Sequence, residues 1–127
     1  MILHESAEMY LETIYLLGQE KDLVRSVDIA NRMGYSKPTI SEWMGRLSSA
    51  GYVVVEQNGN VRLTDEGQEV AQKIYERHVV LEKLFKALGV DPEIAAEDAC
   101  RVEHYISDKT FEALRKHYEQ FMEQSKE

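Results

Sequence analysis

Apolar residues recur at intervals of three and four along most of this chain, which is the spacing of amphipathic helices. The first such stretch, residues 5–20, predicts a helix with a glycine stop at Gly18. A shorter stretch follows at residues 26–33, where Ser26 is placed to cap the start and Gly34 to end the helix. The chain therefore begins with two amphipathic helices.

A third helix is predicted directly after Gly34, because Ser36 is a good N-cap and Pro38 suits a first helical turn. This helix runs to about Ala50, and Gly51 ends it. Two short helices joined by a glycine turn form a helix-turn-helix. Its second helix would expose a set of polar residues suited to a major groove: Ser36, Lys37, Thr39, Ser41, Glu42 and Arg46. An ordinary helical pair is the alternative.

The periodicity then changes from helix to strand. Residues 52–55 and 61–63 are β runs that flank a turn centred on Asn58 and Gly59. A hairpin directly after a helix-turn-helix is the wing of a winged-helix domain, so the pattern favours DNA binding over an ordinary helical pair. Arg62, on the second run, would be available to a phosphate or a minor groove.

The rest of the chain is helical in pattern. A long apolar stripe predicts one connecting helix over residues 65–88. Asp91 and Pro92 mark the start of the next helix, and a last helix begins at about Ser107.

Composition narrows the class of protein. The chain has 127 residues and is 43% hydrophobic, which suffices for one compact domain or two small ones. It contains no apolar run long enough for a membrane span, and its polar, acidic beginning does not resemble a signal peptide. With one cysteine and no second one to pair with, we expect a cytoplasmic protein whose thiol is reduced.

The net charge of −8 argues at first against a nucleic-acid partner, but the charge is unevenly distributed. Residues 21–63 carry six basic and four acidic side chains, which gives this segment a local net charge of +2. An acidic protein with one more basic module can still bind a phosphate backbone. Arg25 and Pro38 complete the set of predicted DNA-contact residues.

A candidate metal site lies in the segment from Asp98 to Ser107. Cys100, Glu103 and His104 are spaced i, i+3 and i+4, which places them on one face of a helix. A thiolate, a carboxylate and an imidazole on one element form a partial ligand set for a first-row transition metal. The alternative is a half-buried structural cysteine beside a solvated Glu-His pair.

The order of these elements resembles the diphtheria toxin repressor family of metal-dependent transcriptional regulators, in its short form without an SH3-like domain. The matching motifs span nearly the whole chain: Glu8-Met9-Tyr10-Leu11, Pro38-Thr39, Arg77-His78, Ala99-Cys100-Arg101 and Glu103-His104. The resemblance implies a mainly α fold, with a winged helix-turn-helix DNA-binding domain at 1–64 and an all-helical dimerisation and metal-binding domain at 65–127. It also implies a homodimer.

The same resemblance implies metal ligands by position. Met9, Cys100, Glu103 and His104 match the primary activating site of the iron-responsive branch. Two further positions, Glu12 and His78, match ligands of the manganese-responsive branch, which has carboxylates where this chain has Met9 and Cys100. The site is thus a hybrid of the two branches.

The chain also departs from the iron-responsive branch. Ala96 stands where that branch has an ancillary-site histidine, although Glu82 is retained, and 127 residues leave no room for the additional SH3-like domain. A second metal held by Glu12, His78 and a shared carboxylate is an open alternative. Because sulfur ligands are softer than oxygen, we expect Fe(II) to be favoured over Mn(II), with Co(II), Ni(II) or Zn(II) able to substitute.

The sequence thus predicts a metal-activated, homodimeric repressor of metal-homeostasis genes that binds a pseudo-palindromic double-stranded operator and is neither an enzyme nor a membrane protein. Two alternatives remain at this point. One is a winged-helix regulator that responds to a non-metal ligand. The other is a metallohydrolase, for which no second acid or base is visible in the sequence.

Overall fold

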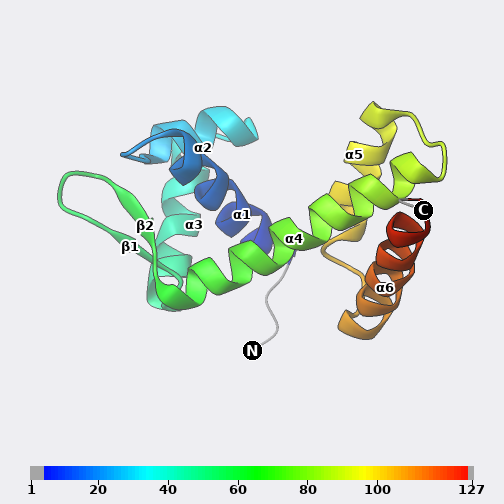
Figure 1. The fold of residues 1–127 in the computed structure, drawn as a ribbon. Helices are drawn as coiled ribbons and strands as arrows, with labels where there is room; N and C mark the ends of the chain where they lie inside the picture. The colour runs from blue at the N-terminus through cyan, green and yellow to red at the C-terminus, as the bar shows by residue number, and fades with distance from the viewer. Residues whose placement is uncertain (1–4, 126–127) are drawn as a thin grey trace. The chain divides into compact units, whose positions relative to one another are not determined.

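Six helices and one β-hairpin make up the part of the chain that the computed structural model describes, residues 5–125 (Figure 1). The elements fall into two compact units, of which the first ends at Lys73 and the second begins at Ile74. Within residues 5–125 no helix combines the length and the apolar character that crossing a lipid bilayer requires. The predicted mainly helical fold class is confirmed.

The first unit is a helix-turn-helix followed by a hairpin. In chain order it contains α1 (Glu5–Glu20), α2 (Ser26–Met33), α3 (Lys37–Ser49), β1 (Val53–Val55) and β2 (Val61–Leu63). Each element turns an apolar face inward, and the resulting core includes Leu11, Ile14, Ile29, Ile40, Met44, Leu47, Val53 and Val61. The apolar positions that predicted the three helices are therefore the positions that form this core.

Local signals in the sequence set the turn between α2 and α3. Gly34 has a φ of 74°, and its N–H donates to Ala30 O at 2.8 Å, which closes the end of α2. Ser36 then caps α3, because its Oγ accepts the Thr39 N–H at 3.4 Å. The predicted roles of Gly34 and Ser36 are confirmed.

The hairpin is attached to the segment between α1 and α2. Its strands pair antiparallel in the register Val53↔Leu63, Val54↔Arg62 and Val55↔Val61. The Val61 N–H also donates to Val24 O at 2.7 Å, and the Val24 N–H donates to Asn60 Oδ1 at 2.9 Å. A two-stranded hairpin is marginal by itself, so these bonds and the buried Val53 and Val61 fix the wing to the unit.

The long helix α4 (Asp65–Ala87) contributes to both units, because the boundary falls within it. Thr64 Oγ1 accepts the Gly67 N–H at 3.1 Å, so Thr64 is the cap at its start. The second unit adds α5 (Pro92–Val102) and α6 (Asp108–Ser125), with Ser107 Oγ capping α6 through the Thr110 N–H at 3.2 Å. Its small core is formed by Leu81, Ala99 and Phe111.

Two helix-end predictions for the first unit are wrong. Gly18 does not end α1, which continues to Glu20, where an ion pair with Arg32 at 2.6 Å supports the last turn. Ser26 is the first residue of α2 and not its cap. The N-cap position is Arg25, whose N–H donates to Asp28 Oδ2 at 2.9 Å, so a carboxylate in the first turn replaces the expected hydroxyl.

The prediction of one continuous helical face for Cys100, Glu103 and His104 is also wrong. Helix α5 ends at Val102, Glu103 occupies its C-cap position, and His104 lies in the turn that leads to α6. The apolar side chains of α5 are only partly buried: Ala95 and Ala99 lie inside, whereas Ile94 is 51% exposed.

Candidate metal centre and nucleic-acid interface

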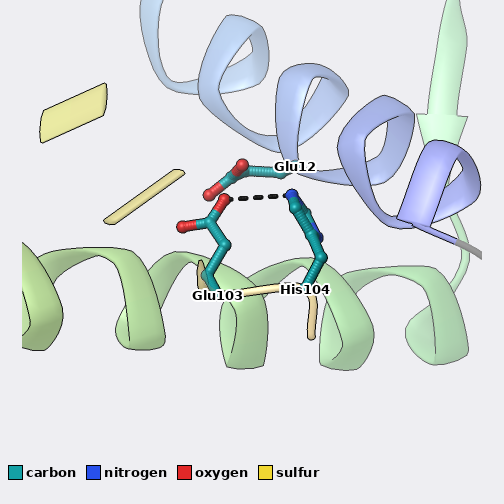
Figure 2. A group of neighbouring side chains, drawn as sticks. All are labelled: Glu12, Glu103 and His104. Atoms are coloured by element: carbon teal, nitrogen blue, oxygen red, sulfur yellow. Dashed lines mark ion pairs between the residues drawn. The ribbon is translucent and has the colours of Figure 1, made fainter. Parts of the chain in front are cut away.

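The carboxylate of Glu103 lies between two imidazoles in the second unit. Its Oε2 is 3.0 Å from Nδ1 of His78, and its Oε1 is 3.2 Å from Nε2 of His104 (Figure 2, dashed line). Glu103 is fully buried, and the side chain of His104 is 1% exposed. A buried carboxylate whose two oxygens face two imidazoles is a natural ligand set for a divalent metal ion.

His78 is positioned by helix α4, one turn before Glu82. Its Nε2 lies 3.2 Å from Glu82 Oε2, so each of its two ring nitrogens faces a carboxylate. Glu82 also pairs with Lys86 at 3.2 Å, and both residues lie one turn apart on α4. The structure therefore brings together three of the predicted ligands: His78, Glu103 and His104. Glu82 lies close to His78.

Cys100 lies one turn before Glu103 on α5. It is a free thiol of intermediate burial. Among the described contacts, none joins its Sγ to the imidazoles or to Glu103.

Met9 and Glu12, the remaining predicted ligands, belong to α1 of the first unit. They lie one turn apart on that helix and are both partly buried; Glu12 is labelled in Figure 2. The Met9 carbonyl accepts the Thr13 hydroxyl at 2.8 Å. Met9 also lines a hollow of about 150 Å³ together with Ser6, Tyr10, Met33, Tyr35, Thr39 and Trp43.

The sequence pattern gave no individual site role to Arg77, yet the structure makes it a central residue of the second unit. Arg77 is 6% exposed and donates to the carbonyl oxygens of Glu103 and Ile106, at 3.2 and 2.7 Å. An arginine on a helix is usually on the surface, so the residue type gave no sign that Arg77 is buried. The one sequence signal was its place beside His78 in a family motif.

Helix α3 presents the predicted DNA-contact residues to solvent. Its exposed side chains include Ser36, Lys37, Pro38, Thr39, Ser41, Glu42 and Arg46. Its inner face is anchored by Ile40, Met44 and Leu47, which are buried. The helix therefore has one face in the core and one row of polar side chains available to a partner.

The polar face of α3 contains one internal ion pair. Arg46 Nη2 lies 2.7 Å from Glu42 Oε1, and the Arg46 guanidinium lies 5.2 Å from the centre of the Trp43 ring. Trp43 in turn lies 5.0 Å from the ring of Tyr10, whose pKa is raised by burial. Glu42 and Arg46 thus form an exposed ion pair, and Arg46 also packs on Trp43.

The other two predicted DNA contacts flank this helix in the first unit. Arg25 is exposed at the start of α2. Arg62 is exposed on β2, and its Nε lies 3.8 Å from Glu56 Oε1. Near Arg25, a hydrogen bond from Lys21 and one from the Arg25 N–H hold the pKa of Asp28 below its usual value.

Two family models together match nearly the whole chain. Residues 2–61 match the N-terminal DNA-binding domain of the iron-dependent repressors, and residues 64–126 match their metal-binding and dimerisation domain. The chain is also 40% identical, over 111 residues, to the transcriptional regulator MntR of Escherichia coli O6:H1, with 87% of this chain and 72% of that protein covered. The chain belongs to the iron-dependent repressor family.

Two further comparisons support the same family. The diphtheria toxin repressor of Corynebacterium diphtheriae is 34% identical, with 88% of this chain and 50% of that protein covered. A solved structure of a manganese-dependent transcriptional repressor in complex with manganese has a TM-score of 0.78 and 32% identity, and covers 88% of this chain. The chain covers 52% of the length of the protein in that structure.

Membership in the iron-dependent repressor family confirms the general prediction of a metal-dependent, DNA-binding transcriptional repressor. It also confirms that the protein is a regulator and not an enzyme, because the family consists of transcriptional repressors. The second family model includes a dimerisation domain, in agreement with the predicted homodimer.

Proposed function

We propose that this repressor binds its activating metal through Glu103, His104 and His78, completed by Met9, Glu12 and Cys100, with Glu82 beside His78. The observation that carries the proposal is the buried Glu103 carboxylate between two imidazoles. A buried carboxylate needs compensating charge, and a divalent ion supplies it.

The donor set suits one ion or two. A carboxylate can bridge two ions through its two oxygens, and those of Glu103 face different imidazoles, His78 and His104. Glu12 and Glu82 are the further carboxylates available for a second ion. A metal-binding isotherm with one or two equivalents per chain distinguishes the two cases.

Fe(II) is the proposed activating metal, ahead of Mn(II). Thioether and thiolate donors from Met9 and Cys100 are softer than carboxylates, which moves preference away from Mn(II). Co(II), Ni(II) and Zn(II) are expected to substitute in vitro. In a reducing cytoplasm, the proposed location, Cys100 stays a thiol.

Regulation follows from ligands that come from both units. Residues of α1, in the DNA-binding unit, and residues of the second unit would share one ion, so fewer relative positions of the units remain accessible. In a homodimer this restricts the separation of two α3 helices, which must lie roughly 34 Å apart to enter successive half-sites of a pseudo-palindromic operator. By linkage, operator binding then tightens metal binding by the same factor, on the usual scale of about 1–3 kcal/mol.

The test is a DNA-binding titration with each divalent metal under anaerobic, reducing conditions. We expect Fe(II) to activate binding at lower free concentration than Mn(II), and a chelator to reverse it. Operator binding that is indifferent to both metal and chelator would contradict the proposal and favour a non-metal effector.

A further inference from the structure

Arg77 is the buried cation of the second unit that contacts the turn carrying the proposed ligands. Its Nη1 donates to Glu103 O at 3.2 Å and to Ile106 O at 2.7 Å, and its Nη2 pairs with Asp108 Oδ1. The side chain of Arg77 is only 8% exposed. One guanidinium therefore contacts two main-chain carbonyls of the turn between α5 and α6 and the carboxylate of the first residue of α6.

One of these contacts satisfies a carbonyl group that the end of a helix leaves open. The last carbonyls of a helix have no partner within it, and Glu103 occupies the C-cap of α5. Arg77 supplies donors to the carbonyls at both ends of the turn, at Glu103 and at Ile106. Because the guanidinium has a second terminal nitrogen, Arg77 also pairs with Asp108 through Nη2 while Nη1 binds the two carbonyls, and the single nitrogen of lysine cannot reproduce this arrangement.

Consecutive residues of α4 contact Glu103 in two different ways. Arg77 binds the main-chain carbonyl of Glu103, and His78 contacts its carboxylate at 3.0 Å. The main chain and the side chain of Glu103 are thus fixed from the same rigid helix. His104 follows Glu103 in the same turn, so its backbone is restrained by the same contacts.

A second arginine provides an internal comparison. Arg77 and Arg115 both lie over the buried ring of Phe111, at 5.4 and 5.0 Å from its centre. Arg115 pairs with Glu76 and Glu112 and has no hydrogen bond to the 103–106 turn among the described contacts. Both arginines pack on the same aromatic ring, but only Arg77 contacts the turn.

We propose that Arg77 is a positioning residue of the metal centre. It does not bind metal itself, but it holds the Glu103–Ile106 turn so that Glu103 and His104 are preorganised before any ion arrives. The inference rests on the proposed function, since it assumes that Glu103 and His104 are ligands. Contacts that orient ligands in this way typically change metal affinity by about 10–100-fold when removed.

The test compares Arg77→Lys with Arg115→Lys in the full chain, with Co(II) as the probe under anaerobic conditions. Three quantities are measured: the Co(II) dissociation constant, the intensity of the Co(II) d–d absorption, and amide hydrogen exchange of residues 103–106 in the metal-free protein. We expect Arg77→Lys to weaken Co(II) binding by about 10–100-fold, to alter the absorption and to accelerate exchange in the turn. Arg115→Lys should leave all three close to wild type, although both variants lower the melting temperature.

The inference is overturned if both arginine variants weaken Co(II) binding equally, or if Arg77→Lys leaves affinity and turn exchange unchanged. If Arg77→Lys does not fold, the carboxylate partners are compared instead. Asp108→Ala removes a partner of Arg77 and should weaken Co(II) binding, whereas Glu112→Ala removes a partner of Arg115 and should not. Equal effects of these two variants also overturn the inference.

The same measurements distinguish a wrong role for Arg77 from a wrong assignment of the metal ligands. If wild-type protein binds no Co(II), or if Glu103→Gln binds it as tightly as wild type, the ligand assignment is wrong. If wild type binds Co(II) through Glu103 but the Arg77 and Arg115 variants behave alike, only the role of Arg77 is wrong.

Discussion

His78 and Glu103 are 25 residues apart in the chain, and their side chains meet with 3.0 Å between Nδ1 and Oε2. The contact joins α4 to the turn after α5, and the Glu103 side chain is completely buried. Glu103 is therefore part of the interior as well as a proposed ligand. Truncating it would leave a cavity, so the informative substitution keeps its shape.

Glu103→Gln should abolish metal-dependent operator binding while the protein stays folded and dimeric. Glutamine preserves the volume of the side chain but removes the charge that binds the ion. We expect a loss of metal affinity of more than about tenfold, because removing even an outer-shell partner of a ligand typically costs about 10–100-fold. His104→Gln, which keeps much of the buried side-chain volume, should have the same effect. Gel-shift assays with added metal, alongside circular dichroism, measure it, and Glu97→Gln on the exposed face of α5 is the control. Metal-activated binding of wild-type strength in both variants would remove these residues from the site.

Metal preference should follow the sulfur ligands. The double variant Met9→Asp with Cys100→Glu replaces thioether and thiolate by carboxylates, so activation should shift toward Mn(II) and the response to Fe(II) should weaken. The ranking of metals in an anaerobic DNA-binding titration measures this. Met122→Asp, at an exposed methionine of α6, controls for added charge. An unchanged ranking in the double variant would mean that these two positions do not set selectivity.

Two residues on α3 should affect DNA binding in different ways. Lys37→Ala should weaken binding to operator and random DNA alike and lower the salt slope by about 0.9, the equivalent of one phosphate contact. Glu42→Ala should relax discrimination at one base pair, because a carboxylate can accept from a cytosine amino group. It also releases Arg46, its partner at 2.7 Å, so affinity for random DNA should rise.

Fluorescence anisotropy over a salt series, with one operator and one scrambled duplex, compares these variants. Glu20→Ala is the matched control, because it breaks a similar exposed pair with Arg32, at 2.6 Å, outside α3. If Lys37→Ala and Glu42→Ala show the same uniform loss on both duplexes, Glu42 does not read sequence, and Thr39 or Ser41 becomes the better candidate.

The stability of the DNA-binding unit should depend on pH through Asp28. Its carboxylate accepts hydrogen bonds from the Lys21 side chain, at 2.7 Å, and from the Arg25 N–H, at 2.9 Å, which lower its pKa in the folded protein. A carboxyl with a lowered folded-state pKa contributes stability that is fully present above its unfolded pKa, about 3.9. That contribution is lost as the pH falls through the folded-state value.

Asp28→Asn should therefore lower the free energy of unfolding at neutral pH, and the difference from wild type should shrink as the pH falls below about 4. Urea unfolding over a pH series measures it. The control is Asp22→Asn, at an exposed position in the loop that precedes α2. A difference that stays constant down to the lowest pH would show that the charge of Asp28 is not what stabilises the cap.

Gly67 in the first turn of α4 should not tolerate a side chain. A Cβ there would overlap the carbonyl oxygen of Tyr52 and lie 3.3 Å from Leu63 Cδ2. Gly67→Ala should destabilise the protein by about 1–3 kcal/mol, as overpacking usually does. Gly18→Ala, in a helix with open space around it, should instead stabilise by about 0.5–1 kcal/mol. Thermal unfolding compares the two, and equal effects would contradict the close approach.

Much of the first unit is predictable from local sequence, because the signals that set it are local. The apolar spacing of Ile40, Met44 and Leu47 specifies which face of α3 is buried. Gly34 ends α2 because a left-handed φ favours glycine. Such features need no information about distant residues.

The end of α5 could not be predicted in this way. The helical spacing of Cys100, Glu103 and His104 continues without a glycine or proline to stop it. The helix ends at Val102 where Arg77, from another helix, binds the carbonyls of the turn. Gly67 is similar, since its requirement comes from Tyr52. Both features depend on contacts between residues that lie far apart in the chain.

Trp43 is the single tryptophan of the chain, and it lies on α3 between the ring of Tyr10 and the guanidinium of Arg46. Excitation at the red edge of protein absorption therefore selects one indole, at the surface where an operator would approach. Displacement of Arg46 toward a phosphate would change the charge next to that indole and shift its emission. If α3 enters the operator as predicted, Trp43 is a native optical probe of operator binding, and no label has to be attached.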